Sequence, residues 1–410
     1  MSIGCTSADF ATSTAGDDSG LPTDDGVRDD TAIADGGLDA PHGDGASDSL
    51  PVDAILPDAT PVDTGTPTCT STDRFNRTSY LVGANPSAIA LGDIDANGTL
   101  DLVVANAGAG TINVLYGHGD GKFDIGPLQS VGATPSGVAF GDFDGDKNAD
   151  IAVSLLGENS VGVLLGSSGG KLGTVQTFAV GGQPTALATA RLNVDARTDI
   201  VVADGGGNTI HVLLTKTSSK LEFDVQTVGV GLNPTDVVVT DLNKDTLPDF
   251  VVVNGGADSI SLLNAAPGGG WIPGATLTVG LSGPRKAVMG DFYNKGRLDI
   301  AVTNKTGGNV AILPALGTAT FGPGKTYPAP ITDPTGIAAA DFDGDGHLDF
   351  LAGGGEAMGL FDIGSLTPAT SKLAVPGVAI VTGDFNGDGK PDAAAVNPAG
   401  NAISIILACH

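Results

Sequence analysis

Short apolar runs separated by polar, glycine-rich segments recur along most of this chain. In the first repeat the runs occupy residues 88–91, 102–105 and 112–115, and a fourth run begins near Phe123. Short apolar runs bounded by turn-forming residues predict β-strands, and consecutive strands joined by tight turns pair in an antiparallel manner. Each repeat therefore predicts one four-stranded antiparallel sheet.

An acidic stretch and a proline set the period of the repeats. The acidic stretch begins at positions 93, 142, 191, 241, 291, 341 and 384, so the intervals are 49, 49, 50, 50, 50 and 43 residues. A proline precedes each of these positions by seven residues, or by eight in the last repeat. Repeats near this length with strand-like content are typical of propeller blades. The sequence predicts an all-β protein, a seven-bladed β-propeller.

The two ends of the repeat region complement each other. The last repeat stops soon after its third predicted strand, at 403–407, whereas a spare strand at 75–82 precedes the first proline. The simplest architecture makes this N-terminal strand the outer strand of the last blade. Such closure also covers an edge strand that would otherwise be open.

The acidic stretch follows the first predicted strand of each repeat. In the sixth repeat Asp341, Asp343, Asp345 and Asp349 occupy positions 1, 3, 5 and 9, and His347 at position 7 offers its carbonyl. Carboxylates held so close together repel one another unless a cation lies among them, and Ca²⁺ prefers several oxygen ligands. No helical period flanks the stretch, so it is a hairpin loop and not an EF-hand.

Five repeats keep this ligand set and predict about five Ca²⁺ sites. The predicted metal ligands are Asp93, Asp95, Asn97, Thr99, Asp101, Asp142, Asp144, Asp146, Asn148, Asp150, Asp241, Asn243, Asp245, Leu247, Asp249, Asp341, Asp343, Asp345, His347, Asp349, Asp384, Asn386, Asp388, Lys390 and Asp392.

Two copies of the acidic stretch are altered. Arg191 replaces the first Asp of the third copy, and Tyr293 and Lys295 stand at positions 3 and 5 of the fifth copy. A guanidinium or ammonium group can neutralise carboxylates without a metal ion. We therefore expect Arg191 and Lys295 to contact the remaining acids of their loops, with side chains turned to water as the alternative.

Composition separates an acidic leader from the repeats. The 410-residue chain has a formal net charge of −28, and residues 1–72 contain 14 Asp but only one basic residue, Arg28. This charge argues against a nucleic-acid partner. The low-complexity composition predicts a disordered tether over 1–72, which leaves the propeller to residues 73–410.

The start of the leader, Ser2-Ile3-Gly4-Cys5, resembles the end of a bacterial lipoprotein signal, although the charged and apolar regions of such a signal are missing. Cys5 is therefore a lipidation candidate if the true start of the chain lies upstream, and an incidental cysteine is the alternative. A lipid anchor is the only membrane contact that we expect, because no apolar stretch is long enough to span a bilayer. The predicted location is extracellular, or the surface or periplasm of a bacterial cell.

The acidic loops and the Gly-x-x-Pro turns together resemble the FG-GAP/VCBS repeats of integrin α-chain propellers and of many secreted bacterial proteins. The resemblance extends from residue 74 to residue 408. It implies calcium in the five intact loops, on one face of the ring. It implies no specific adhesive partner, because integrin-type recognition uses the opposite face and often additional domains.

The preferred interpretation is a secreted or surface-anchored, monomeric calcium-binding propeller that acts as a binding or adhesion module for a glycan or a protein. The alternatives are a polysaccharide lyase or hydrolase on a propeller scaffold and a structural component of an envelope. Catalysis finds little support, because His118, His211 and His347 are scattered and no nucleophile motif or zinc spacing occurs.

The fifth repeat gathers basic residues within an otherwise acidic protein. A docking surface for an anionic glycan and a solvated patch are both consistent with this cluster. Its members are Arg285, Lys286, Lys295, Arg297 and Lys305.

A disulfide is predicted between Cys69 and Cys409. Cys69 lies just before the N-terminal strand and Cys409 just after the third strand of the last repeat, so the closure brings the two near each other. An extracellular location would allow the bond to persist. Closing so long a loop would stabilise the fold by at most about 5 kcal/mol. Two free thiols are the alternative.

Overall fold

Residues 75–218, 220–363 and 369–408 are described in the computed structural model, and their regular structure is β-strand apart from one 3₁₀ turn, η1 (Leu156–Glu158). Three predictions fall outside these residues. They are the lipidation candidate Cys5, the disulfide between Cys69 and Cys409, and the boundary between tether and propeller at residue 72. Within the described ranges, no helix has the length and apolar character that a membrane span requires.

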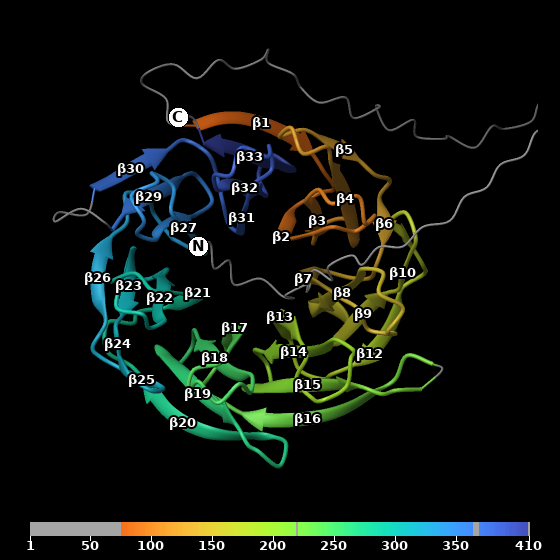
Figure 1. Ribbon diagram of the computed structural model, residues 1–410, viewed down its shortest axis with the longest axis horizontal. Helices are drawn as coiled ribbons and strands as arrows, with labels where there is room; N and C mark the ends of the chain where they lie inside the picture. The colour runs from red at the N-terminus through yellow and green to blue at the C-terminus, as the bar shows by residue number, and fades with distance from the viewer. Residues whose placement is uncertain (1–74, 219, 364–368, 409–410) are drawn as a thin grey trace, which may run out of the picture. The chain divides into compact units, whose positions relative to one another are not determined.

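The strands form seven antiparallel sheets, or blades, arranged around one axis as in a propeller (Figure 1). The innermost strands are β2 (Pro86–Gly92), β7 (Pro135–Gly141), β13 (Pro184–Ala190), β17 (Pro234–Thr240), β21 (Pro284–Gly290), β27 (Gly336–Ala340) and β31 (Ile380–Gly383). Each contacts the innermost strand of the next blade, and β31 contacts β2, so the ring is closed. The predicted seven-bladed propeller is confirmed.

Outward from the axis, each blade adds a second and a third strand. The second strands are β3 (Asp101–Asn106), β8 (Asp150–Leu155), β14 (Asp199–Asp204), β18 (Asp249–Asn254), β22 (Asp299–Asn304), β28 (Asp349–Gly353) and β32 (Asp392–Asn397). The third strands are β4 (Thr111–Gly117), β9 (Ser160–Leu164), β15 (Thr209–Thr215), β19 (Ser259–Ala265), β23 (Asn309–Leu313), β29 (Met358–Asp362) and β33 (Ala402–Ala408).

The outermost strands are the most variable part of the blades. They are the divided pair β5 (Phe123–Ile125) and β6 (Gln129–Ser130), then β12 (Gln176–Ala179), β16 (Phe223–Gly229), β20 (Trp271–Leu277), β26 (Lys325–Pro328), β30 (Ala369–Leu373) and β1 (Phe75–Leu81). Small hairpins precede the outer strand in blades 2 and 5, formed by β10 (Gly166–Ser167) with β11 (Lys171–Leu172) and by β24 (Ala315–Gly317) with β25 (Thr320–Phe321).

The last blade is completed by the N-terminal strand, as predicted. Strand β1 pairs with β33 in a continuous antiparallel register that runs from Phe75 opposite Ala408 to Leu81 opposite Ala402. The side-chain hydroxyl of Tyr80 also accepts the N–H of Phe123 in blade 1 (3.1 Å), so the N-terminal strand touches both the last and the first blade.

The core consists of apolar layers between successive blades. The second strands β3, β8, β14, β18 and β22 are buried at every residue, because both faces of each blade are covered by its neighbours. Such strands read as nearly continuous apolar runs, as in the sequence Phe-Val-Val-Val after Asp249. The small and β-branched residues of these runs suit a closely packed sheet surface.

Apolar residues also anchor the acidic loops between blades. At position 2 of the first loop, Ile94 packs with Val138 and Phe140 of blade 2, and at position 2 of the second loop Phe143 packs with Ile200 of blade 3. The same position in the other loops holds Leu192, Leu242, Phe292, Phe342 and Phe385, which pack into the following interfaces. The alternation of polar and apolar residues thus turns the side chains at positions 1, 3 and 5 away from the apolar layer that holds position 2.

In blades 1 to 4 a side-chain hydroxyl links each blade to the next at the opposite end, where the innermost strands of blades 1 to 5 begin with proline. Each hydroxyl donates to a proline carbonyl of the next blade. The bonds are Ser87 to Pro135 (2.7 Å), Ser136 to Pro184 (2.8 Å), Thr185 to Pro234 (2.7 Å) and Thr235 to Pro284 (3.4 Å), and Thr235 also donates to the backbone carbonyl of Arg285 (2.8 Å). We call this end of the ring the proline end, and the end that carries the acidic loops the loop end.

Candidate metal centres

The acidic loops join the first and second strands of their blades, as predicted. Side-chain oxygens of each loop accept backbone N–H groups of the same loop. In blade 1, Asp93 accepts the N–H groups of Asn97 (3.0 Å) and Gly98 (2.9 Å), and Asp95 accepts that of Asn97 (3.1 Å). The backbone at Ala96 and Gly98 takes positive φ values of 60° and 85°, which folds the loop tightly.

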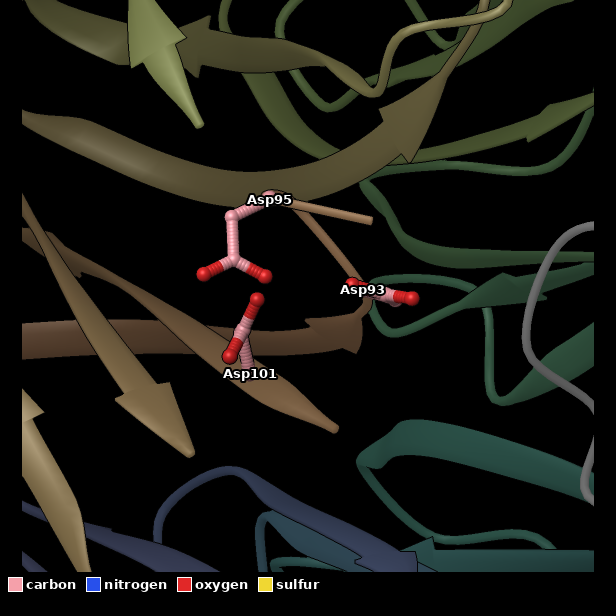
Figure 2. Close-up of side chains that lie close together, drawn as sticks. All are labelled: Asp93, Asp95 and Asp101. Atoms are coloured by element: carbon pink, nitrogen blue, oxygen red, sulfur yellow. The ribbon is translucent and has the colours of Figure 1, made fainter. Parts of the chain in front are cut away.

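Three loops bring carboxylates together. In each of these groups the ligand atoms lie within 4.8 Å of one another. The groups are Asp93, Asp95 and Asp101 in blade 1, Asp142, Asp144 and Asp146 in blade 2, and Asp341, Asp343 and Asp349 in blade 6. In blade 1 the carboxylates of Asp95 and Asp101 face each other (Figure 2). Each set contains three of the predicted ligands, at positions 1, 3 and 9 in blades 1 and 6 and at positions 1, 3 and 5 in blade 2.

The loops of blades 4 and 7 carry an asparagine at position 3. The side-chain amide of Asn243 donates to Asp245 (2.9 Å), and that of Asn386 donates to Asp388 (3.3 Å). An amide can offer either its oxygen to a cation or its N–H to a carboxylate. These two loops therefore carry three aspartates each, one fewer than the loops of blades 2 and 6, and they have an internal partner for one of their carboxylates.

The aspartate at position 9 has a second role that the sequence did not reveal. In blade 1, Asp101 accepts the N–H of Ile94 (2.8 Å) through one oxygen and the N–H of Gly117, at the end of the third strand, through the other (2.7 Å). Six blades show both bonds, and in blade 5 Asp299 accepts the N–H of Ala315 (2.7 Å). The other five are Asp150, Asp199, Asp249, Asp349 and Asp392.

The altered loops of blades 3 and 5 keep this aspartate although they have lost other ligands. Position 9 is therefore a structural clamp that ties the loop to the backbone at or just after the third strand in six blades, and in blade 5 Asp299 keeps only the bond beyond the third strand. In blades 1 and 6 the same carboxylate, that of Asp101 and Asp349, is also a member of the group of three carboxylates. A cation bound there would be connected to the blade through the clamp.

Burial shifts the titration of the clamp residues. It raises the pKa of Asp150 and Asp349 to about 7 and that of Asp199 and Asp392 to about 6, although the backbone N–H donors act in the opposite direction. Neighbouring loop carboxylates add to the rise by repulsion. The pKa is raised in the same direction, again chiefly by burial, at Asp101, Asp249 and Asp299.

The expectation for the altered loops is wrong. Arg191 is exposed, and among the described residues neither Arg191 nor Lys295 forms an ion pair with an acid of its loop. Lys295 instead lies over the ring of Tyr293, with its ammonium 5.8 Å from the ring centroid. In blade 3 it is Arg197 that is held in place, by donating to the carbonyls of Lys216 (2.6 Å) and Ser218 (3.2 Å).

The structure adds one acidic residue that the sequence analysis missed. Asp362, at the end of β29, groups with Asp343 and Asp345 within the same 4.8 Å limit, and one of its oxygens is buried with no hydrogen-bond partner among the described residues. Its proximity is one of the causes that raise the pKa of Asp343, after burial and Asp345. Among the described residues, the acidic loop of blade 6 therefore has more carboxylates around it than the loop of any other blade.

The basic cluster predicted for the fifth repeat is divided between the two ends of the ring. Lys295 and Arg297 belong to the loop between β21 and β22, at the loop end. Arg285 and Lys286 begin β21, and Lys305 follows β22, which places these three at the proline end. The five residues therefore do not form a single docking surface.

A model of FG-GAP-like repeats matches residues 93–153 and 291–352. Each match starts at position 1 of an acidic loop and ends in the second strand of the following blade. The chain carries FG-GAP-like repeats. The family resemblance inferred from the loops is thereby confirmed for the propeller scaffold. Because the FG-GAP match at 291–352 begins in the altered loop of blade 5, membership of the repeat does not depend on a full ligand set.

Solved structures with a similar fold are distant in sequence from this FG-GAP-repeat chain. BBS1N in complex with ARL6DN is 12% identical with a TM-score of 0.57, and the alignment covers 80% of this chain and 94% of that one. Virginiamycin B lyase from Staphylococcus aureus is 12% identical with a TM-score of 0.54, covering 82% and 100%. At these identities the similarity concerns the fold alone. No curated protein matches the chain in sequence.

Proposed function

We propose that this protein is a secreted or cell-surface β-propeller whose acidic loops bind calcium ions and whose ring acts as a binding module. The observation that carries the calcium proposal is the grouping of three carboxylates in each of blades 1, 2 and 6. None of these three groups includes an acid that pairs with a basic side chain in the part of the chain that the structure describes. Grouped carboxylates without a basic side chain to neutralise them favour a hard cation with oxygen ligands.

The ions would have a structural role. The five predicted ligand sets lie in blades 1, 2, 4, 6 and 7, and each includes the clamp aspartate at position 9. A bound cation would neutralise the loop and stabilise the charged form of the clamp, which burial disfavours. Stability should then depend on calcium through mass action, because the unfolded chain holds no such site.

Thermal melting with added calcium and with a chelator tests this proposal. A site filled at about 100 times its dissociation constant stabilises the fold by about 2.7 kcal/mol, so millimolar calcium should raise the melting temperature. Elemental analysis of the dialysed protein should find about five calcium ions per chain, one for each intact loop. An unchanged melting temperature together with a metal-free protein would exclude the calcium sites.

The binding role rests on the scaffold. The BBS1 structure contains a partner, ARL6, so a ring of this fold can present a surface to another protein. A glycan or a protein is the proposed ligand, and a glycan array screened with and without calcium would identify the class. If no ligand binds on the glycan array, with or without calcium, or in a parallel screen against extracellular proteins, a structural component of the envelope is the better interpretation.

Catalysis remains the alternative function, and a polysaccharide-acting enzyme would need acids and bases that converge. The three histidines of the described residues lie in different blades. His118 contacts Asp124 in blade 1 (3.1 Å), His211 contacts Asp204 in blade 3 (3.2 Å), and His347 contacts Asp345 in blade 6 (3.3 Å). No observation therefore brings them into one site.

Attachment to the cell surface through a lipid on Cys5 is a separate proposal. It is supported by the sequence around Cys5 and by the polar composition of the residues that follow. Mass spectrometry of the N-terminal peptide from a bacterial host, compared with a Cys5→Ser variant, tests it. An unmodified Cys5 in the membrane fraction would contradict it.

A further inference from the structure

Charged residues are confined to one place on the innermost strands. Across β2, β7, β13, β17, β21, β27 and β31, the charged residues are Asp236 in β17 and Arg285 and Lys286 in β21. All three lie at the proline end of the neighbouring blades 4 and 5. The positions of Asp236 and Lys286 hold small residues in blades 1 to 3, namely Ala88, Gly137 and Ala186. Departures from a repeated local pattern point to function when no structural gain explains them.

Arg285 replaces a structural hydroxyl. The residue after the first proline is Ser or Thr in blades 1 to 4 and in blade 6, and in blades 1 to 4 it links to the next blade. In blade 5 this link comes from a different strand, because Thr303 of β22 donates to the carbonyl of Thr335 in blade 6 (3.4 Å). The contact between blades is thus maintained without the side chain of Arg285.

At the proline end of blades 4 and 5, the basic side chains are not all paired with acids. The ammonium of Lys286 lies 3.6 Å from a carboxylate oxygen of Asp236, and the other oxygen of Asp236 accepts the N–H of Ala287 (3.1 Å). Asp258 of blade 4 accepts the N–H of Gly283 (2.6 Å). Among the residues that the structure describes, Arg285 forms no ion pair, and its half-buried side chain has a buried Nε with no hydrogen-bond partner.

A second cation lies close to Arg285 in the sheet. Lys305 directly follows Asn304, and Asn304 pairs with Pro284, the residue before Arg285. Lys305 also forms no ion pair within the described ranges. The turns between the second and third strands also lie at the proline end. Lys305 is the only basic residue in these turns of the described chain. Blade 5 therefore supplies every cation of the innermost strands and of these turns.

We propose that the proline end of blade 5 binds an oxyanion group of a ligand, a carboxylate or a sulfate, through Arg285 with Lys305 beside it. A guanidinium presents N–H donors in a planar fork that matches an oxyanion, and a partly desolvated donor without a partner gains most from one. Lys286 does not take part directly, because Asp236 already holds it. The acidic remainder of the protein would repel anions elsewhere, so this spot would also orient the ligand.

This site gives the binding role proposed above a ligand class and rests on that role, but it does not depend on the calcium loops at the other end. The test variant is Arg285→Thr, which restores the hydroxyl that five other blades carry and should therefore fold. Lys305→Ala is the second variant. Lys171→Ala, an exposed basic residue of blade 2, is the matched control. Lys286 is left unchanged because its removal would leave Asp236 buried without a partner.

The direct measurement follows the side-chain Nε–H signals of arginine in a proton–nitrogen correlation NMR spectrum of the full chain with saturating calcium. The Arg285 signal is assigned by its loss in Arg285→Thr. We expect glucuronate or sulfate, but not chloride at equal ionic strength, to shift this signal in a saturable way. Saturation by glucuronate indicates a carboxylate ligand, and saturation by sulfate indicates a sulfate ester.

Affinity for the effective anion should fall about tenfold or more in Arg285→Thr, less in Lys305→Ala, and not at all in Lys171→Ala. A response of Arg285 that is no larger than that of Arg77 or Arg197 would overturn the proposal, and so would full affinity in Arg285→Thr. Calcium-dependent melting is measured on the same samples. If the anions do not shift the Arg285 signal but calcium raises the melting temperature, only the oxyanion site is rejected. If the anions shift the Arg285 signal but calcium does not raise the melting temperature, only the calcium sites are rejected.

Discussion

At the scale of single residues, the loops differ in how well their backbone suits the bend that the ligands require. Position 6 has positive φ in blade 4 and in blade 7, where it holds Thr246 (71°) and Gly389 (82°) respectively. A β-branched residue is strained in this region, whereas glycine is not. The same loop geometry is therefore obtained at different cost in different blades.

Replacing Thr246 with glycine should raise the free energy of unfolding by about 1 kcal/mol, because it relieves this strain. The reverse change, Gly389→Thr, should lower it by a similar amount. Chemical denaturation of both variants with calcium present measures the two effects. Destabilisation by Thr246→Gly would show that the threonine side chain contributes more than its backbone strain.

Asp362 is predicted to strengthen the blade 6 site. Asp362→Asn keeps the size of the side chain but removes one charge, so the calcium affinity of one site should fall about tenfold. Calorimetric titration of calcium measures this loss as a change in the tightest class of sites. Asp333→Asn, an exposed acid in the same repeat, is the control and should leave every site unchanged. Identical titrations for Asp362→Asn and the wild type would remove Asp362 from the site.

The clamp residue Asp199 gives a pH dependence that is free of metal binding, because its loop lacks a full ligand set. Burial raises its pKa to about 6, so the folded state holds a proton that the unfolded chain has already lost. The contribution of Asp199 to the free energy of unfolding must therefore fall as the pH rises from about 4 to about 6. The advantage of the wild type over Asp199→Asn should be larger at the lower pH, as measured by denaturation in calcium. An advantage that grows with pH would mean that the two N–H donors hold Asp199 as an anion.

At the scale of the element, each acidic loop is a hairpin fixed at two points, the apolar plug at position 2 and the clamp at position 9. The side chain at position 2 fills space between two blades, where packing is close. Phe143 is fully buried in the layer between blades 2 and 3. Metal ligands can thus vary from blade to blade without loss of the loop.

Removing this plug should unfold more than the loop. Phe143→Ala is expected to lower the free energy of unfolding by about 3–5 kcal/mol, with calcium binding lost only as far as the fold is lost. Phe178→Ala, at a partly exposed residue of the outer strand β12, is the matched control and should cost less. Equal losses from the two variants would contradict the anchoring role of position 2.

The sequence predicted the blades because each strand and turn is encoded locally. Apolar runs, prolines and acidic stretches in fixed phase specify strand order, and the spare strand before Pro86 specifies the closure. The sequence did not predict the direction of Arg191 or Lys295, because long side chains at exposed positions can turn to water as easily as to an acid. It also missed Asp362, which reaches the loop of Asp343 only through the pairing of β28 with β29. The clamp role of position 9 could not be predicted, because an aspartate suits both a metal ligand and an acceptor of backbone N–H groups.

At the scale of the whole molecule, the ring depends on a strand from the far end of the chain. The outward edge of β33 carries the sequence Ala-Ile-Ser-Ile-Ile-Leu-Ala, which is covered by β1. An uncovered apolar edge strand invites pairing with other chains. The N-terminal strand therefore protects the protein from self-association as well as closing the last blade.

Deleting residues 1–82 should lower the melting temperature and produce concentration-dependent aggregates, whereas deleting residues 1–72 should do neither because β1 is kept. Light scattering with calcium present distinguishes the two proteins. A monomeric, equally stable product of the longer deletion would show that the ring does not need its N-terminal strand. A shorter deletion that aggregates would instead assign a protective role to the leader.

The pairing of Phe75 with Ala408 also sets an order of events in time. The first strand of the propeller to leave the ribosome is the one whose partner is made last. At synthesis rates of about 5–20 residues per second, β1 waits on the order of tens of seconds before β33 exists. During this wait Phe75 and Tyr80, which are buried in the folded protein, lack the partner strand of β1. A polar, charged leader attached directly to this strand would help to keep the waiting segment soluble.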